Sequence, residues 1–392
     1  MQKYLSENFY KYIAGTSNEP MGIEIENTKG MYINTTGGKQ YLDMIAGISV
    51  CNMGHSHPAI IEAVKKQVDK YMHVMVYGEL IQEPQVEMAH LLGENLPEKL
   101  SSVYFVNSGA EAVEGGLKLA KRITGRKEII HCRNSYHGCT QGAMSVMGSD
   151  SFKAPFQPLL PDTKAIRFGV TEDLEMITDK TACFIVEPVQ GEAGIRIASG
   201  EYWKAVRERC NETGTLLIFD EIQTGMGRTG KLFCFEHYGI IPDILLLAKA
   251  LGGGLPLGAF ISSKENMQFL THDPALGHMT TFGGHPVSCA AAVAHFKLLL
   301  EGKFWEKAEH YGAILEKEIL SIDGIREIRR KGLMMAADFG DETKNILTYK
   351  KWLDKGIFTD WFLFCNTALR IAPPLIITDK EIMEFKNRIG AS

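Results

Sequence analysis

Two charged residues of the chain follow apolar runs that have the length of buried strands. Lys249 ends the run that begins at Asp243 and leads into glycines 252–254, and Asp220 ends the run that begins at Thr215. A lysine whose charged form is disfavoured by burial is a nucleophile towards carbonyl carbons. The pattern predicts a site that combines an amine with a carboxylate, with an internal Lys–Asp ion pair as the alternative.

The chemistry of this amine and this carboxylate matches the needs of pyridoxal phosphate. A lysine amine can bind the aldehyde of that cofactor, and an aspartate can keep its pyridine nitrogen protonated. We therefore interpret Lys249 as the Schiff-base lysine and Asp220 as the partner of the ring nitrogen. From these two residues alone, the cofactor site and the internal ion pair are equally well supported.

A phosphate site is predicted where a buried strand meets a helix. Residues 101–107 have the pattern of the strand, and Ser108, Gly109 and Ala110 lead into helical spacing. Ser108 and Glu111 have the spacing of a capping box, and the free N–H groups at a helix N-terminus suit a phosphate. An ordinary capped helix is the alternative, because Ser-x-x-Glu is common before helices.

An aromatic residue and an imidazole follow the next predicted strand. Tyr136 and His137 come shortly after residues 127–132. A ring at this position could stack on the face of a pyridine. The alternative for Tyr136 is an ordinary core or rim tyrosine.

These segments resemble the class III pyridoxal-phosphate aminotransferases, above all the ornithine and acetylornithine aminotransferases. The resemblance runs through most of the chain in family order, and the blocks around Asp220 and Lys249 are together highly specific. The matching segments are residues 54–58, 107–112, 136–138, 187–194, 220–230, 242–254, 280–284 and 369–374. The resemblance implies an α/β fold of type I, with a mostly parallel sheet in a large domain and a smaller α+β domain formed by both termini.

The resemblance also implies a role for each matching residue. Lys249 and Asp220 take the catalytic roles given above, and Gln223 faces the phenolic oxygen of the cofactor. The other implied cofactor contacts are Ser108, Gly109 and Ala110 at the phosphate, Tyr136 and His137 at the ring, and Glu187 beside them. Thr281 is implied to reach the phosphate of the partner subunit's cofactor, so that a homodimer shares its active sites.

Substrate binding is expected to depend on Glu192 and Arg370. In ornithine-type relatives, the matching glutamate covers the arginine while an ω-amine donor binds. It then moves, and the arginine holds the α-carboxylate of 2-oxoglutarate with its planar fork. The alternative for each residue is a solvated surface charge.

The chain departs from the resembled enzymes at positions that affect the substrate. Cys139 stands where relatives acting on ornithine, acetylornithine or 4-aminobutyrate usually carry an arginine for a substrate carboxylate. The tyrosine that contacts ornithine has no evident counterpart at residues 16–20. The aromatic segment 359–364 indicates either an apolar donor site or simple core packing. His285 replaces the usual asparagine, and no consequence is predicted.

Composition fits a soluble enzyme. The 392 residues are 45% hydrophobic and 23% charged, which is enough for a large core and more than one domain. A net charge of −5 without a basic cluster argues against nucleic acid as a partner. The eight scattered cysteines indicate reduced thiols, and no metal site is predicted. Without a signal-peptide region or a transmembrane run, we expect a cytoplasmic protein with no membrane partner.

Strands alternate with helices from about residue 51 to about residue 289, which predicts a mostly parallel sheet covered on both faces. Helices are predicted at residues 58–71, 83–94, 108–124, 201–212, 286–300, 303–320, 344–355 and 379–389, and strands within 22–43 and at 325–330 and 333–339. We expect residues 51–289 to form a large cofactor-binding domain. Residues 1–50 and 290–392 are expected to form the smaller one.

The sequence therefore predicts an aminotransferase that moves an amino group from an ω-amino donor to 2-oxoglutarate, with ornithine, acetylornithine and 4-aminobutyrate as candidate donors. The first alternative is a racemase, an aminomutase or a decarboxylase that acts on an amino acid with the same cofactor. The second is a cofactor-binding regulatory protein without activity. Such proteins usually carry a DNA-binding domain, for which the chain has no spare length.

Overall fold

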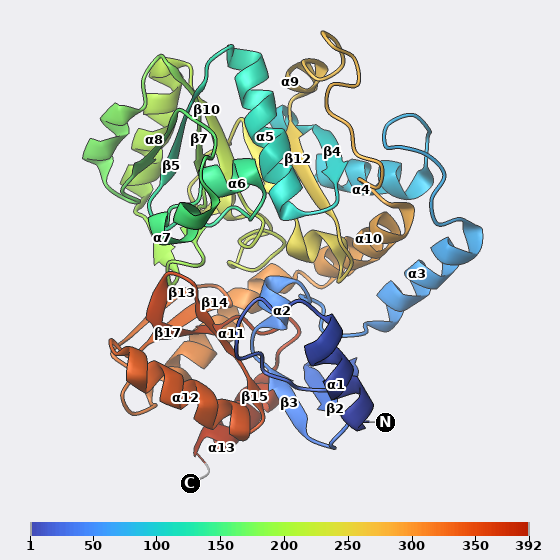
Figure 1. Ribbon diagram of the computed structural model, residues 1–392, viewed down its shortest axis with the longest axis vertical. Helices are drawn as coiled ribbons and strands as arrows, with labels where there is room; N and C mark the ends of the chain where they lie inside the picture. Colours follow the sequence, from blue (N-terminus) through green and yellow to red (C-terminus); the bar gives the residue numbers. More distant parts are fainter. Residues whose placement is uncertain (1, 391–392) are drawn as a thin grey trace.

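The computed structural model describes residues 2–390, and its largest element is a seven-stranded sheet in the upper half of Figure 1. The strands are β4 (Ser102–Val106), β5 (Glu128–Cys132), β6 (Thr163–Ile166), β7 (Thr181–Val186), β10 (Leu216–Asp220), β11 (Ile244–Leu247) and β12 (Gly258–Ser262). Their order is β4-β12-β11-β10-β7-β5-β6. Because only β12 is antiparallel to its neighbours, the predicted mostly parallel sheet is confirmed.

Helices cover both faces of this sheet and extend beyond it. They are α1 (Gln2–Tyr12), α2 (Ala46–Ser49), α3 (Pro58–Lys70), α4 (Glu83–Glu94), α5 (Gly109–Thr124), α6 (Gln141–Ser145), α7 (Asp150–Lys153), α8 (Gly200–Thr213), α9 (Lys264–Gln268), α10 (Pro286–Glu301), α11 (Phe304–Leu320), α12 (Glu342–Asp354) and α13 (Asp379–Gly390). None of these helices, within residues 2–390, is long and apolar enough to cross a membrane.

Apolar side chains alternate between the two faces of the central strands. Ile218 of β10 and Leu246 of β11 share a core with α5. Leu217 and Leu245 belong to the core on the opposite face, together with Trp203 of α8. A parallel sheet that is buried on both faces needs apolar residues at successive positions, which explains the continuous apolar runs in the sequence.

The carboxyl ends of four parallel strands meet at one edge of the sheet. β4, β7, β10 and β11 run in the same direction, since β12 is antiparallel to both β4 and β11. Ser108, Glu187 and Lys249 follow three of these strands closely, and Asp220 ends the fourth. Open α/β sheets bind ligands at this edge, so the topology brings the predicted functional residues to one place.

Two smaller sheets are built from both ends of the chain. One contains β1 (Ile25–Lys29), β2 (Tyr32–Thr35), β3 (Gln40–Asp43) and β15 (Ile357–Phe358), and the other contains β13 (Glu327–Lys331), β14 (Met334–Asp338), β17 (Cys365–Ile371) and β16 (Asp360–Phe362). Because β3 pairs with β15, the N-terminal strands lie beside the C-terminal segment in the lower half of Figure 1. We propose that these sheets and α11 to α13 form the smaller domain. The boundary after residue 289 stays a prediction and falls within α10, which packs against α3 and α4.

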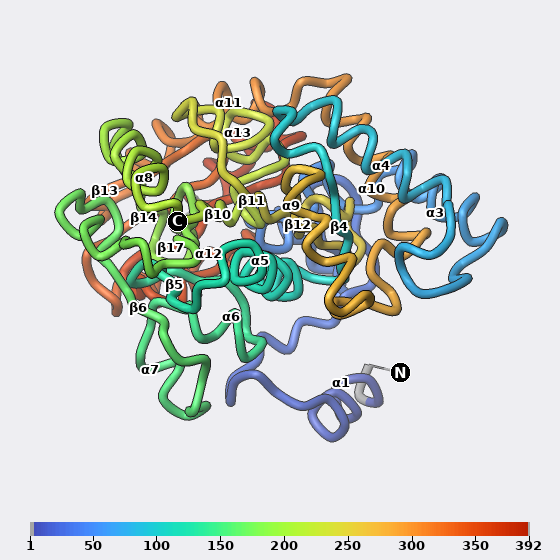
Figure 2. Tube along the Cα trace, turned by 90° about the horizontal axis from the view of Figure 1, so that it is seen from above, coloured from blue at the N-terminus to red at the C-terminus, as the bar shows by residue number. Residues whose placement is uncertain are grey.

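The eight predicted helices coincide with α3, α4, α5, α8, α10, α11, α12 and α13, and their ends differ by at most two residues. The start of α12 lies earlier than predicted because Asp341 caps the helix and accepts a bond from the Lys344 N–H at 2.8 Å. The sequence predicted neither α1 nor β12. In Figure 2, α1 lies at the edge of the molecule, outside the body formed by the other elements.

Candidate active site

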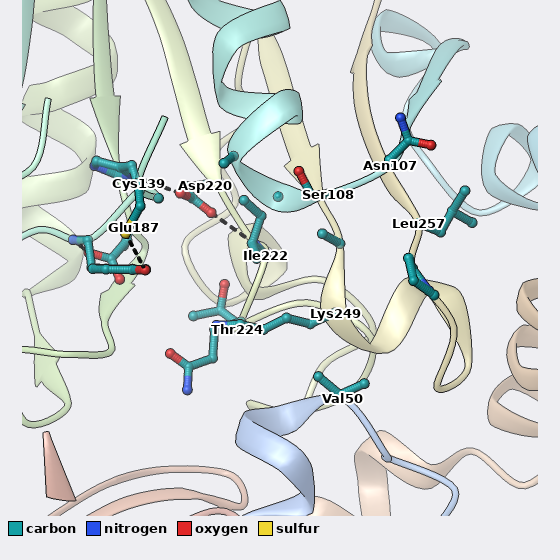
Figure 3. A pocket seen from close by; sticks show the side chains of 18 of the residues that line it. Val50, Asn107, Ser108, Cys139, Glu187, Asp220, Ile222, Thr224, Lys249 and Leu257 are labelled. Carbon is teal, nitrogen blue, oxygen red and sulfur yellow. Dashed lines mark hydrogen bonds and ion pairs between the residues drawn. The ribbon is translucent and has the colours of Figure 1, made fainter. Parts of the chain in front are cut away.

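A cavity of about 510 Å³ opens at the carboxyl edge of the large sheet. Figure 3 shows side chains that line it from several elements, among them Val50, Ser108, Cys139, Glu187, Asp220 and Lys249. Most of the predicted site residues line this cavity: Ser108, Gly109, Ala110, Tyr136, His137, Glu187, Glu192, Asp220, Gln223 and Lys249. Arg370 meets the lining through Glu192, and Thr281 is exposed and lies outside the lining.

Asp220 is buried at the end of β10, and both of its carboxylate oxygens have hydrogen-bond partners. Oδ2 lies 2.7 Å from Nδ1 of His137, and Oδ1 accepts a bond from the N–H of Ile222 at 3.0 Å. A carboxylate that is bonded through both oxygens has little freedom to turn. The site therefore holds one negative charge in a fixed place beside the cavity.

Lys249 begins the turn after β11 with a φ of 47°. A positive φ is uncommon for any residue except glycine, and strained residues of this kind cluster at functional sites. Burial lowers the pKa of Lys249 and the charge of Arg370 lowers it further, while Glu192 and Asp220 act in the opposite direction. The amine therefore reaches its uncharged, nucleophilic form more readily than an ordinary lysine.

The first turn of α5 faces the cavity with Gly109 and Ala110. Ser108 caps this helix, as predicted, and its hydroxyl accepts a bond from the N–H of Glu111 at 3.2 Å. The carboxylate of Glu111 accepts a bond from the N–H of Asn107 at 2.7 Å, one residue before the cap. In a capping box this carboxylate would accept from the N–H of Ser108 itself, so the second bond of the predicted box is displaced by one residue. A capped N-terminus that opens onto a cavity can bind a phosphate.

Glu187 joins two loops of the site. One of its oxygens accepts a bond from the N–H of Tyr136 at 3.1 Å, and the other accepts one from the N–H of Gly191 at 3.0 Å. Burial raises the pKa of Glu187 to about 7. The hydroxyl of Tyr136 lies 3.4 Å from the thiol of Cys139, which lines the cavity. The two loops are therefore fixed relative to each other, and the thiol of Cys139 lines the cavity where the resembled enzymes usually carry an arginine.

Glu192 and Arg370 form a buried ion pair. Nη2 of Arg370 donates to both carboxylate oxygens of Glu192 at 2.8 Å, and its guanidinium lies 4.8 Å from the centre of the Phe362 ring. Nε and Nη1 of Arg370 have no hydrogen-bond partner among the residues that the structure describes. Only one nitrogen of the fork is used in this pair. The sequence placed these two residues in one substrate site, and the structure brings them into contact.

The aromatic segment 359–364 lies outside the lining of the cavity. Phe362 packs against Arg370, and Trp361 packs edge-on against Tyr349 at 5.1 Å. Phe362 is therefore a core residue, whereas Trp361 is exposed, and neither lines the cavity as an apolar donor site would require. His285, for which the sequence predicted no consequence, caps α10, because Nδ1 accepts a bond from the N–H of Val287 at 3.3 Å.

Several residues in the lining were not predicted. They are Val50; Ile222 and Thr224, which lie within the matched block 220–230; and residues 255–257, which directly follow the block 242–254. Ile222 and Thr224 lie close to Asp220, and residues 255–257 follow the glycines after Lys249. These positions are the signal that could have found them. Val50 lies at the end of α2, and no pattern in the sequence connects it with this edge of the sheet.

The arrangement fits pyridoxal phosphate. Lys249 offers an amine, Asp220 a fixed anion and the first turn of α5 a phosphate site, all in one cavity. Nε2 of His137 and Nε2 of Gln223 also line this cavity region, are buried, and have no hydrogen-bond partner within residues 2–390. An unpaired buried polar group costs about 1–3 kcal/mol, so these atoms are consistent with a polar ligand.

Comparisons with known proteins agree with this chemistry. The acetylornithine aminotransferase of Methanopyrus kandleri is 42% identical over 350 residues, which cover 88% of this chain and 87% of that protein. A LysW-aminoadipate semialdehyde/glutamate semialdehyde transaminase of Sulfolobus acidocaldarius is 37% identical and covers 93% of each chain. The ornithine aminotransferase of Toxoplasma gondii, a structure with partial occupancy of pyridoxal phosphate, has a TM-score of 0.91 at 29% identity, covering 99% of this chain and 93% of its own.

The family model for class III aminotransferases matches residues 13–391, nearly the whole chain. The fold of the Toxoplasma gondii structure confirms the predicted type I architecture. The chain therefore belongs to the class III aminotransferases and is a pyridoxal-phosphate-dependent transaminase.

Proposed function

We propose that this transaminase moves an amino group from an ω-amino donor, such as ornithine, acetylornithine or 4-aminobutyrate, to 2-oxoglutarate. The buried pair of Glu192 and Arg370 in the wall of the cavity carries this proposal. It places a carboxylate-binding guanidinium close enough for its charge to lower the pKa of Lys249, and Glu192 covers that guanidinium. The name of the acetylornithine aminotransferase from Methanopyrus kandleri supports a donor of this class.

The cofactor contacts are proposed from the positions of the lining residues. Lys249 would hold the cofactor covalently, Asp220 would face the ring nitrogen and Gln223 the phenolic oxygen. The remaining proposed contacts are Ser108, Gly109 and Ala110 at the phosphate, and Tyr136, His137 and Glu187 around the ring. Each of these residues lies in the same cavity, and the capped helix and the unpaired nitrogens give the set a physical basis.

Lys249 is the proposed acid and base of the reaction. Bound pyridoxal phosphate supplies an electron-accepting ring, which stabilises the charge left on a carbon that loses a proton. Nζ of Lys249 would take that proton from the amine-bearing carbon of the donor and deliver it to C4′ of the cofactor. The lowered pKa of Lys249 favours the uncharged amine that this step needs. His137 keeps Asp220 in position through their 2.7 Å contact.

Glu192 and Arg370 would allow two different substrates to use one cavity. While the pair is closed, the guanidinium is neutralised, and an amine at the end of a donor chain meets no free cation there. When Glu192 moves aside, Arg370 can bind the α-carboxylate of 2-oxoglutarate bidentately, using nitrogens that are unpaired in the closed pair. In a ping-pong exchange the donor and the acceptor occupy the same cavity in turn, and this alternation would present Arg370 to the acceptor alone.

The donor is proposed to bind mainly through its ω-amine and its chain. Among the described residues of the lining, Lys249 is the only lysine or arginine, whereas Glu187, Glu192 and Asp220 are acidic. Cys139 cannot replace a guanidinium as a partner for a distal carboxylate. Donors with and without such a carboxylate should therefore differ little in their Michaelis constants.

Removing Arg370 tests the acceptor site. We expect Arg370→Ala to raise the Michaelis constant for 2-oxoglutarate by about 10- to 100-fold, the effect of losing hydrogen bonds to a charged group. Glu192→Ala should raise activity with α-amino donors such as glutamate, because Arg370 is then always uncovered. The Michaelis constant for 2-oxoglutarate and the activity with α-amino donors can be measured in separate half-reactions.

Arg196→Ala is the matched control for Arg370→Ala, since Arg196 is an exposed arginine on β9 (Arg196–Ile197). It should leave both half-reactions unchanged. An unaltered Michaelis constant in Arg370→Ala, or an unaltered donor preference in Glu192→Ala, would remove the exchange from this proposal.

A homodimer with shared active sites is proposed from exposed apolar side chains in residues 72–86 and 276–282, the second of which contains Thr281. They are Met72, Val74, Met75, Leu80, Ile81, Val86, Leu276, Met279 and Phe282. The two segments that carry them touch, since the N–H of Tyr77 donates to the carbonyl of Thr280 at 3.3 Å. An apolar patch of this kind marks an interaction surface, and Thr281 is exposed within it.

Thr281→Ala should weaken cofactor retention without dissociating the dimer. One charge-assisted hydrogen bond to a phosphate contributes about 1.5–3 kcal/mol, so the cofactor dissociation constant should rise about tenfold or more. Thr271→Ala, at an exposed threonine of the preceding segment, is the control. Sedimentation that finds a fully active monomer would contradict the shared site, and an unchanged dissociation constant would leave Thr281 as a turn residue only.

A further inference from the structure

The carboxylate of Glu192 has a second hydrogen-bond donor besides Arg370. The backbone N–H of Leu363 donates to Oε2 of Glu192 at 3.0 Å. Leu363 and Phe364 form the turn between β16 and β17, in which Phe362 pairs with Cys365. One hairpin therefore supplies both groups that hold this carboxylate, the guanidinium from its second strand and the N–H from its tip.

The backbone around Glu192 is held independently of its side chain. The N–H of Phe364 donates to the carbonyl of Glu192 at 3.1 Å, and Nε of Arg329 donates to the carbonyl of Gly194. The first bond docks the turn onto the hairpin, and the second docks it onto β13. Rotation of the Glu192 side chain would uncover the guanidinium without moving this backbone, and it would break the bond from Leu363.

The tip of the hairpin is held in place by an aromatic contact. Phe364 packs edge-on against Phe152 of α7, with ring centres 5.3 Å apart. The side chain of Leu363 is itself 45% exposed, so this residue acts on Glu192 through its N–H rather than through packing. The position of that N–H depends on Phe152, a residue outside the cavity lining.

We propose that the N–H of Leu363 is a latch that holds Glu192 over Arg370 and so sets how readily the site admits an α-carboxylate. This inference rests on the proposed exchange between Glu192 and a substrate carboxylate. Leu363 is a positioning residue, because in the closed pair it contacts Glu192 and neither substrate. A hydrogen bond to a charged group is large enough to change the balance by about tenfold or more.

Proline at position 363 removes the N–H and nothing else that contacts Glu192. Leu363 does not have a positive φ, which a proline ring excludes, and proline is favoured at the first central position of common turns. Leu363→Ala keeps the N–H and is the matched control. The probe is glutarate, a dicarboxylate without a carbonyl to react, and its dissociation constant is measured by calorimetry on the holoenzyme.

Leu363→Pro should bind glutarate about tenfold more tightly and show a lower Michaelis constant for 2-oxoglutarate, whereas Leu363→Ala should match the unmodified protein. Phe152→Ala, which frees the hairpin tip but keeps every donor, should give a smaller change in the same direction. It also serves as the test if the proline variant does not fold. Weaker glutarate binding in Leu363→Pro would overturn the latch, since the N–H would then be a ligand of the substrate.

Glu192→Gln separates this inference from the function on which it rests. If the glutamine variant tightens glutarate binding while Leu363→Pro and Phe152→Ala do not, the latch is refuted and the exchange at Arg370 stands. If the glutamine variant leaves glutarate binding unchanged, the exchange itself is refuted, and the latch with it.

Discussion

Replacing Lys249 with alanine is expected to abolish transamination while the protein still folds. The variant loses the covalent attachment of the cofactor and the group that moves the proton, and proton transfer by a positioned side chain alone contributes about 10²- to 10⁴-fold. The catalytic constant should therefore fall by at least about 10⁴-fold. Thermal unfolding should change little, because burial disfavours the charge of this lysine.

The same variant can be examined by chemical labelling. Borohydride should fix the cofactor to Lys249 in the unmodified protein, where peptide mass spectrometry locates it, and should fix none at this position in Lys249→Ala. Lys231→Ala removes an exposed lysine from the loop between β10 and β11 and is the control. Full turnover by Lys249→Ala would show that another group is the acid and base.

Asp220→Asn is expected to have the second-largest effect, a fall in the catalytic constant of about 10²- to 10³-fold. This is the usual effect of removing a preorganised group that stabilises charge in the transition state. Asparagine keeps the shape of the side chain and can still accept from the N–H of Ile222, so the fold should be retained. It cannot stabilise a protonated ring nitrogen as an anion does.

Asp243→Asn is the matched control, since Asp243 also lies at the sheet and accepts bonds from the N–H of Leu217 and from Arg207. Its variant should lose some stability but keep its catalytic constant. The pH dependence of the absorbance of the bound cofactor should differ from that of the unmodified protein in Asp220→Asn. It should be the same as in the unmodified protein in Asp243→Asn. Equal catalytic constants in the two variants would separate Asp220 from the ring nitrogen.

The sequence predicted those functional residues that stand at or just after the end of a strand. Asp220, Lys249 and Ser108 each stand at the end of a local pattern, an apolar run or a helix start, and the fold then brings these ends to one edge. Contacts between elements that are far apart in the chain do not follow from such local patterns. The contact of Leu363 with Glu192 joins residues that are 171 positions apart, and no periodicity encodes it.

The predictions also missed elements whose position is set by tertiary contacts. β12 is a short run with small residues at its start, and it becomes a strand because β4 and β11 offer hydrogen bonds on both of its sides. Val50 lines the cavity because the N-terminal segment folds back onto the large sheet. The proposed role of Thr281 is a contact between subunits, which no local sequence pattern encodes.

Because β12 lies between β4 and β11, the large sheet fixes the spacing of the residues that face the ligand. Neighbouring strands lie about 4.8 Å apart, so the helix that follows β4 and the lysine that follows β11 are separated by about two such steps. Asp220 on β10 lies one step further. Backbone ladders fix these intervals, and side-chain substitutions in the loops do not stretch them. Substitutions in the β16–β17 hairpin can therefore change the substrate, while the distances between the residues proposed to bind the cofactor stay constant.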